Sequence, residues 1–303
     1  RRGNNPEEVF DRGGHKTPTF PCPLALEKIL VCTDDSPASQ GAVKTALDLA
    51  QACDSRIYLL FALEFYPYFE YPQPDALSIA PVVSQELFDL RERIAREHLE
   101  TWRREAVQRG LALEARLQWG RQAYVEILAA AEELKPDLIV MGRRGKSGLE
   151  RLLVGSVTAR VIGHTSGKVL VAPRDAVLSF ERLLVASDGS PAGQAAFQEA
   201  LSMAKRTGGQ LNLITAAHGE LDPKRAKALV KELAAQAQRQ QVPLKTFTPE
   251  GRPEEAIIQM AIAKKIDLII MGSQGRTGLK RLFLGSVAER VIGQAPGPVL
   301  VVK

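Results

Sequence analysis

Two segments of the chain carry glycines and a Gly-Ser pair at the same spacing, in the pattern G-x2-G-x9-G-S. Glycine lets the backbone approach a ligand closely or adopt a positive φ angle, and free N–H groups in such a loop form an anion-binding concavity. A Gly-Ser pair that opens a helix adds unpaired N–H groups and the positive end of the helix dipole. The pattern therefore predicts two phosphate sites. Their candidate residues are Gly142, Gly145, Gly155 and Ser156 in the first loop and Gly272, Gly275, Gly285 and Ser286 in the second.

The same glycines could serve only turns and helix caps, and an isolated G-x-x-G would favour that interpretation. The repetition of the whole pattern after a strand and before a helix favours phosphate binding instead. Neither loop matches the Walker A pattern or the G-x-G-x-x-G dinucleotide fingerprint. Lys146 and Arg276 could add positive charge to the loops. We expect a side chain at Gly142 or Gly272 to obstruct the phosphate or ribose.

An internal repeat organises the chain. Residues 27–50 align without a gap with residues 181–204, and residues 137–157 align in the same way with residues 267–287. Repetition over this length predicts two copies of one domain in tandem. The expected division is a linker-like arm at residues 1–23, a first domain at residues 24–176 with an insertion near residues 64–88, and a second domain at residues 177–303.

Apolar runs alternate with helical periodicity within each copy. Continuous apolar strands separated by helices predict an α/β fold with a parallel sheet covered on both faces, and right-handed crossovers make that sheet doubly wound. Ligands of such sheets bind beyond the carboxyl ends of the strands. In the first copy we expect strands at residues 29–33, 56–63, 113–119, 137–141 and 168–172, and helices at residues 38–53, 86–109, 121–134 and 151–165.

One aspartate follows the first strand of each copy. One residue separates Asp34, and likewise Asp188, from the Ser-Pro pair that follows it. A carboxylate at the sheet edge could accept hydrogen bonds from ribose hydroxyls, but aspartate before Ser-Pro is also a common turn former. Both roles remain open. Asp35 corresponds to Gly189, so Asp35 is not expected to belong to a site common to both copies.

Composition restricts the class of protein. The formal net charge is +5, with basic and acidic residues interleaved, which is compatible with anionic ligands or with an ordinary mixed surface. No apolar stretch is long enough to span a membrane, and no signal peptide is visible. Three cysteines argue against a disulfide framework and favour a reducing, cytoplasmic setting. We expect no structural metal and no nucleic-acid partner.

The Asp-x-Ser turn after the first strand, the Met-Gly after the fourth and the G-x2-G-x9-G-S loops resemble the universal stress protein family in its tandem form. The resemblance covers roughly residues 24–303. It implies two Rossmann-like domains, each with a five-stranded parallel sheet, and membership of the branch that binds ATP, AMP or ADP, with or without Mg. Asp34 and Asp188 would meet the ribose or adenine side. Ala62 and Ala216 stand where the family usually has a valine whose backbone contacts adenine.

The family also implies dimerisation through the last strand. In a tandem chain, residues 168–172 and 298–302 could pair internally instead and form a pseudo-dimer. The function that the resemblance favours is a nucleotide-responsive regulator in stress adaptation. One alternative is a cytoplasmic regulatory region, or a partner, of a membrane transporter, which the linker-like arm motivates. The other is an enzyme similar to adenine-nucleotide hydrolases, although no catalytic constellation is repeated in both copies.

The insertion contains five aromatic residues between positions 65 and 71. An aromatic loop can mark an interface with a protein or lipid partner. The alternative is that it packs over the sheet of its own domain.

Overall fold

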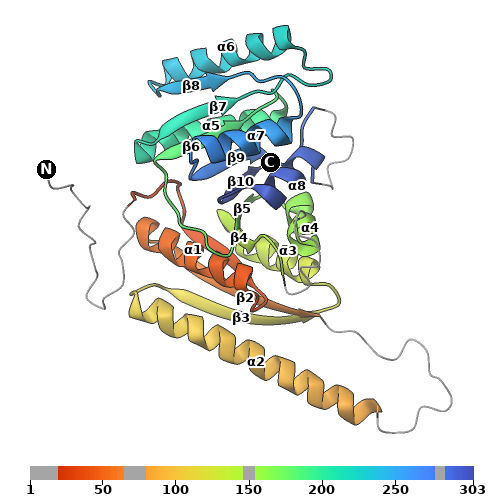
Figure 1. Cartoon of the computed structure of the whole chain (residues 1–303). Coiled ribbons are helices and arrows are strands. Elements are labelled where there is room, and N and C mark those ends of the chain that lie inside the picture. Colours follow the sequence, from red (N-terminus) through yellow and green to blue (C-terminus); the bar gives the residue numbers. More distant parts are fainter. Residues whose placement is uncertain (1–19, 65–79, 146–153, 277–283) are drawn as a thin grey trace, which may run out of the picture.

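The computed structural model describes residues 20–64, 80–145, 154–276 and 284–303. Their strands form a single ten-stranded sheet in the order β3-β2-β1-β4-β5-β10-β9-β6-β7-β8, with helices on both faces (Figure 1). Most of the predicted arm and the five aromatic residues between positions 65 and 71 lie outside the described residues.

The first copy alternates strands and helices as its periodicity predicts. Its elements are β1 (Lys28–Thr33), α1 (Pro37–Cys53), β2 (Arg56–Glu64), α2 (Ala80–Gln108), β3 (Leu113–Gly120), α3 (Ala123–Leu134), β4 (Leu138–Gly142), α4 (Ser156–His164) and β5 (Lys168–Ala172).

The second copy repeats this order. Its elements are β6 (Arg182–Ala186), α5 (Pro191–Thr207), β7 (Gln210–Ile214), α6 (Pro223–Arg239), β8 (Leu244–Phe247), α7 (Pro253–Ala263), β9 (Leu268–Gly272), α8 (Ser286–Gln294) and β10 (Val299–Val302).

Five strands of each copy run parallel to one another, so the predicted tandem, doubly wound α/β fold is confirmed. The two halves of the sheet meet where β5 pairs with β10 in antiparallel fashion, with Leu170 opposite Leu300. This is the internal pairing that the sequence left open beside a homodimer. Because β5 and β10 cover each other's edges, the outer edges of the sheet are β3 and β8.

Two apolar layers cover the sheet. Successive side chains of a strand point to opposite faces, so Ile29 and Val31 of β1 join one layer while Leu30 and Cys32 join the other. The first layer contains residues of α1, α2, α5 and α6, and the second contains residues of α3, α4, α7 and α8. Both layers run through the two copies, so the junction at β5 and β10 lies inside a shared core.

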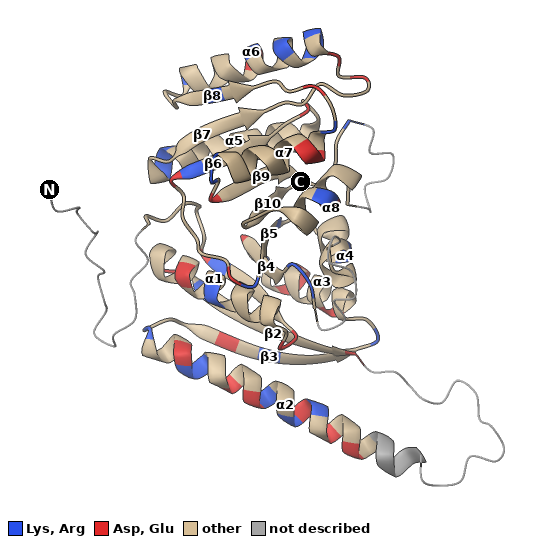
Figure 2. Ribbon diagram, viewed as in Figure 1, with Lys and Arg blue, Asp and Glu red and all other residues tan. Residues whose placement is uncertain are grey.

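Two helices begin five or six residues away from their predicted starts. Helix α2 starts inside the segment predicted as an insertion, and basic and acidic residues are interspersed along it (Figure 2). Helix α4 begins at Ser156 rather than at residue 151, because Gly155 is its N-cap with an extended backbone (φ −60°, ψ 142°).

The cysteine argument was wrong. Cys22 and Cys53 form a disulfide with their Cα atoms 4.7 Å apart, which joins the segment before β1 to the end of α1. An odd cysteine count excludes complete pairing but not one bridge, and Cys32 is the buried free thiol of the set. The disulfide also removes the argument for a reducing compartment that rested on cysteine usage. In the described part of the chain, no helix is both long and apolar enough to cross a membrane.

Candidate functional site

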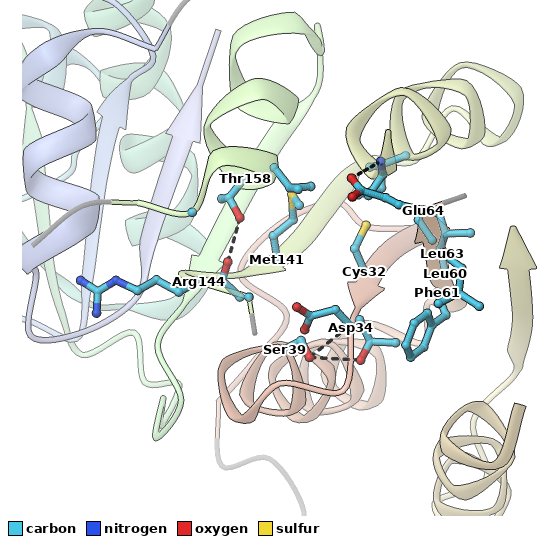
Figure 3. A pocket seen from close by; sticks show the side chains of 18 of the residues that line it. Cys32, Asp34, Ser39, Leu60, Phe61, Leu63, Glu64, Met141, Arg144 and Thr158 are labelled. Atoms are coloured by element: carbon cyan, nitrogen blue, oxygen red, sulfur yellow. Dashed lines mark hydrogen bonds between the residues drawn. The ribbon is translucent and has the colours of Figure 1, made fainter. Parts of the chain in front are cut away.

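A cavity lies at the carboxyl ends of the strands in the first copy. Its volume is about 400 Å³, and residues of β1, β2 and β4 and the first turn of α4 line it (Figure 3). All six residues predicted for this copy are among the lining residues. They are Asp34, Ala62, Gly142, Gly145, Gly155 and Ser156.

The second copy has a matching cavity of about 700 Å³. The chain therefore places one cavity at the same edge of each half-sheet, where doubly wound sheets bind ligands. The six residues predicted for this copy also line their cavity. They are Asp188, Ala216, Gly272, Gly275, Gly285 and Ser286.

Helices α4 and α8, which start at the cavities, lack a side-chain cap. Gly155 and Gly285 are the N-caps of α4 and α8, and neither helix has a side-chain cap hydrogen bond. By contrast, the Ser36 hydroxyl accepts from Ser39 N–H at the start of α1. The first N–H groups of a helix have no partner within the helix, so α4 and α8 offer these donors to a ligand. With the positive dipole end, this geometry suits a phosphate.

One glycine of each loop leaves room for a carboxylate. A Cβ atom at Gly145 would lie 2.5 Å from Asp34 Oδ2, and one at Gly275 would lie 2.7 Å from Asp188 Oδ2. Neither glycine is among the residues with positive φ. These glycines therefore permit the close approach of a carboxylate and are not required for a positive φ angle. Close approach to a phosphate, as predicted from the sequence, remains a prediction.

The first glycine of each loop has a packing role that the sequence did not predict, beside its place in the cavity lining. A Cβ atom at Gly142 would lie 2.8 Å from the backbone of Ala38 and Ser39 in α1, and one at Gly272 would lie 2.7 Å from the backbone of Ala192 in α5. The end of the fourth strand thus packs directly against the helix that follows the first strand. A side chain at Gly142 would disturb this packing before it reached any ligand.

Both aspartates perform turn chemistry. Asp34 Oδ1 accepts from Ser36 N–H and Asp188 Oδ1 accepts from Ser190 N–H, each at 3.0 Å. Asp188 Oδ2 also accepts from Arg276 N–H at 2.9 Å, which ties the end of β6 to the second glycine loop. The carboxylates therefore shape the cavity wall, and a ribose contact would add to that role.

Part of the lining of each cavity is apolar. In the first copy it contains Leu60, Ile127 and Met141, next to Ala62 on β2. In the second copy Ile214, Ile257 and Met271 surround Ala216 in the same way. An apolar lining together with uncapped helix N–H groups suits a molecule that combines a flat ring with an anionic group.

The sequence did not reveal a polar network at the edge of the first cavity. His98 on α2 lies 2.8 Å from Asp35 through Nδ1 and 2.8 Å from the Thr33 hydroxyl through Nε2. Trp102 donates a hydrogen bond to the same Nε2 at 3.1 Å. Gly189 replaces Asp35 in the second copy, and a Cβ atom there would meet Leu229 instead. Asp35 is therefore specific to the first copy, where it contacts α2 through His98 and accepts from Gln40 Nε2 at 3.3 Å.

Among the described residues, no group of three or more His, Cys, Asp or Glu side chains could hold a metal ion.

The fold and the cavities define a tandem, doubly wound α/β protein with one cavity at the strand ends of each copy. The model of the universal stress protein family matches residues 25–173 and again residues 179–303. The chain belongs to the universal stress protein family.

Individual relatives agree with this assignment. A universal stress protein of Mycolicibacterium smegmatis is 27% identical over 297 residues, which cover 91% of this chain and 96% of the relative. Universal stress protein MJ0531 of Methanocaldococcus jannaschii is 35% identical over 148 residues, 49% of this chain and 82% of the relative. The crystal structure of a universal stress protein from Archaeoglobus fulgidus superposes with a TM-score of 0.67 at 26% identity, covering 91% of this chain and 98% of that one.

Proposed function

We propose that each cavity binds one adenine nucleotide and that the chain acts as a nucleotide-responsive regulator in stress adaptation. The observation that carries the proposal is the pair of helices, α4 and α8, whose first turns lack a side-chain cap and line the two cavities. Anions bind at such helix ends because N–H donors and the dipole act together.

The ligand would lie along the cavity from the apolar end to the helix end. The ring would pack near Ala62 or Ala216 among apolar side chains, and the ribose would lie near Asp34 or Asp188. The phosphates of ATP, AMP or ADP would accept from the first N–H groups of α4 or α8 and from the hydroxyl of Ser156 or Ser286. Binding would fix the glycine loops. If the chain has two conformations, the nucleotide would shift the equilibrium between them only by the difference in its affinity for the two.

The test is the nucleotide content and binding capacity of the purified chain. Denaturation should release adenine nucleotide that mass spectrometry identifies, and calorimetry on stripped protein should give two ATP bound per chain. Release of ADP or AMP in proportion to added ATP, with repeated turnover, would favour the hydrolase alternative. If no adenine nucleotide is recovered and ATP produces no heat of binding, the proposal is wrong.

A further inference from the structure

Two consecutive arginines of the first glycine loop reach from their own copy into the other. Arg143 Nη2 donates to the backbone oxygen of Ala295 at 2.7 Å and to that of Gly297 at 3.3 Å. Arg144 Nη2 donates to the backbone oxygen of Gly293 at 3.3 Å, and its guanidinium extends away from the other labelled side chains of the first cavity (Figure 3). The three acceptors lie at and just beyond the C-terminal end of α8, where carbonyl groups favour a cation.

Arg143 contacts both α4 and α8. Its backbone oxygen accepts from Gly155 N–H at 2.9 Å, so its main chain holds the N-cap of α4 in the first cavity. Its guanidinium holds the C-terminal end of α8, whose N-terminal end opens into the second cavity. A helix of nine residues behaves as one rigid body of roughly 13 Å. Movement of the first loop would therefore reach the second cavity.

Arg143 is held at an energetic cost. Burial, with the like charge of Arg144 added, lowers the pKa of Arg143 to about 10. Its Nε atom is buried without a hydrogen-bond partner, and no carboxylate of the described residues forms an ion pair with it. Buried charge without a counter-charge is unfavourable. An anion in the adjoining first cavity, which Arg144 lines, would relieve part of that cost.

The second loop does not make the reverse connection. It has Ser273 and Gln274 at the positions of the two arginines. The C-terminal end of α4 is held instead by Lys303, whose Nζ donates to the backbone oxygen of Gly163 at 3.1 Å. Lys303 follows β10 and does not belong to the second glycine loop, so the arginine pair is a feature of the first loop.

We propose that Arg143, with Arg144 beside it, couples the two cavities so that a nucleotide in one raises the affinity of the other. This inference rests on the proposed function. A phosphate in the first cavity fixes the start of α4 and offsets part of the cost of the buried Arg143 charge. The pair then holds the end of α8 more firmly, and the first turn of α8 is ordered in advance for the second phosphate. Coupling between binding sites is reciprocal, so a nucleotide in the second cavity strengthens binding in the first.

The reciprocal effect can be measured because both tryptophans, Trp102 and Trp119, belong to the first copy. We expect tryptophan fluorescence to report ATP binding in the first cavity, because Trp102 donates to His98, which contacts Thr33 of the cavity lining. The variant Ser286→Phe fills the phosphate end of the second cavity without adding charge, and calorimetry should show one ATP per chain. We expect this block to lower the affinity of the first cavity by about fivefold or more relative to the unblocked chain.

The same block in an Arg143→Ser background should leave the affinity of the first cavity unchanged, because serine has no guanidinium that could hold the end of α8. Serine is also the residue at the matching position of the second loop. Arg143→Lys keeps the charge and should retain part of the coupling. Lys303→Gln is the control, since it removes the cation at the end of α4 and should leave the fivefold effect of the block in place. If thermal melting shows that Arg143→Ser is too unstable to titrate, Arg144→Gln carries the same expectation.

Two outcomes overturn the inference in different ways. If the unblocked chain binds two ATP and the block changes the ATP affinity of the first cavity by less than twofold, the sites are independent. The coupling is then wrong, while the proposed function stands. If neither cavity binds ATP, the proposed function fails and the coupling falls with it.

Discussion

Replacing Ser156 and Ser286 together by glutamate should lower the affinity for ATP by about 100-fold. These residues open α4 and α8, both side chains are exposed, and both line their cavities. A carboxylate about 5 Å from a bound phosphate would repel it by about 3 kcal/mol at an effective dielectric constant of about 20. Calorimetry with stripped protein measures the loss directly.

The matched control is Ser156→Gln with Ser286→Gln, which has nearly the same size and no charge. It should retain affinity within about tenfold, because it removes only the two hydroxyl donors. The glutamate variant should also melt no lower than the parent chain, since an acidic residue in the first turn of a helix favours the helix dipole. If glutamate and glutamine variants bind ATP equally well, the phosphates do not lie at these helix ends.

Gly142→Ala should destabilise the fold rather than simply block a ligand. Its Cβ atom would lie 2.8 Å from the backbone of Ala38 and Ser39, so β4 or α1 would have to move. Overpacking of this kind should lower the free energy of unfolding by about 2–3 kcal/mol. Gly272→Ala should act in the same way on the second copy, where the Cβ atom would meet Ala192.

Denaturant titration checks this result, with Gly167→Ala as the control. The nearest atom to a Cβ at Gly167 is the Thr165 hydroxyl at 3.4 Å, an ordinary contact, so this change should stay within about 1 kcal/mol of the parent chain. A Gly142→Ala variant that loses ATP binding at unchanged stability would contradict the packing role and restore the role predicted from sequence.

Most features of the fold and of the candidate site could be predicted from the internal repeat. Apolar runs followed by Asp34 and Asp188, and loops that begin at Gly142 and Gly272, indicated a doubly wound sheet with its site at the strand ends. The strand order of the structure confirms the fold class. It could be predicted because strands joined by short right-handed connections lie next to one another in a parallel sheet. All twelve predicted site residues line the two cavities, while their contacts with a nucleotide remain predictions.

The remaining features depend on distances between segments that are far apart in sequence. The packing of Gly142 on α1 and the bridge from Cys22 to Cys53 arise only when those segments meet in the fold. The contact of His98 with Asp35 and the reach of Arg143 into the second copy are of the same kind. Residue type and local periodicity hold no information on such contacts. The sequence indicated such contacts only where the two copies differ, as at Asp35, which corresponds to Gly189.

The most direct test of the account is a crystal structure of the chain with ATP. The account predicts a phosphate group about 3 Å from the first backbone N–H groups of α4 and another at the equivalent groups of α8, with each adenine among the apolar side chains near Ala62 and Ala216. Nucleotide bound elsewhere on the chain, or helix ends without phosphate in crystals soaked at saturating ATP, would contradict it.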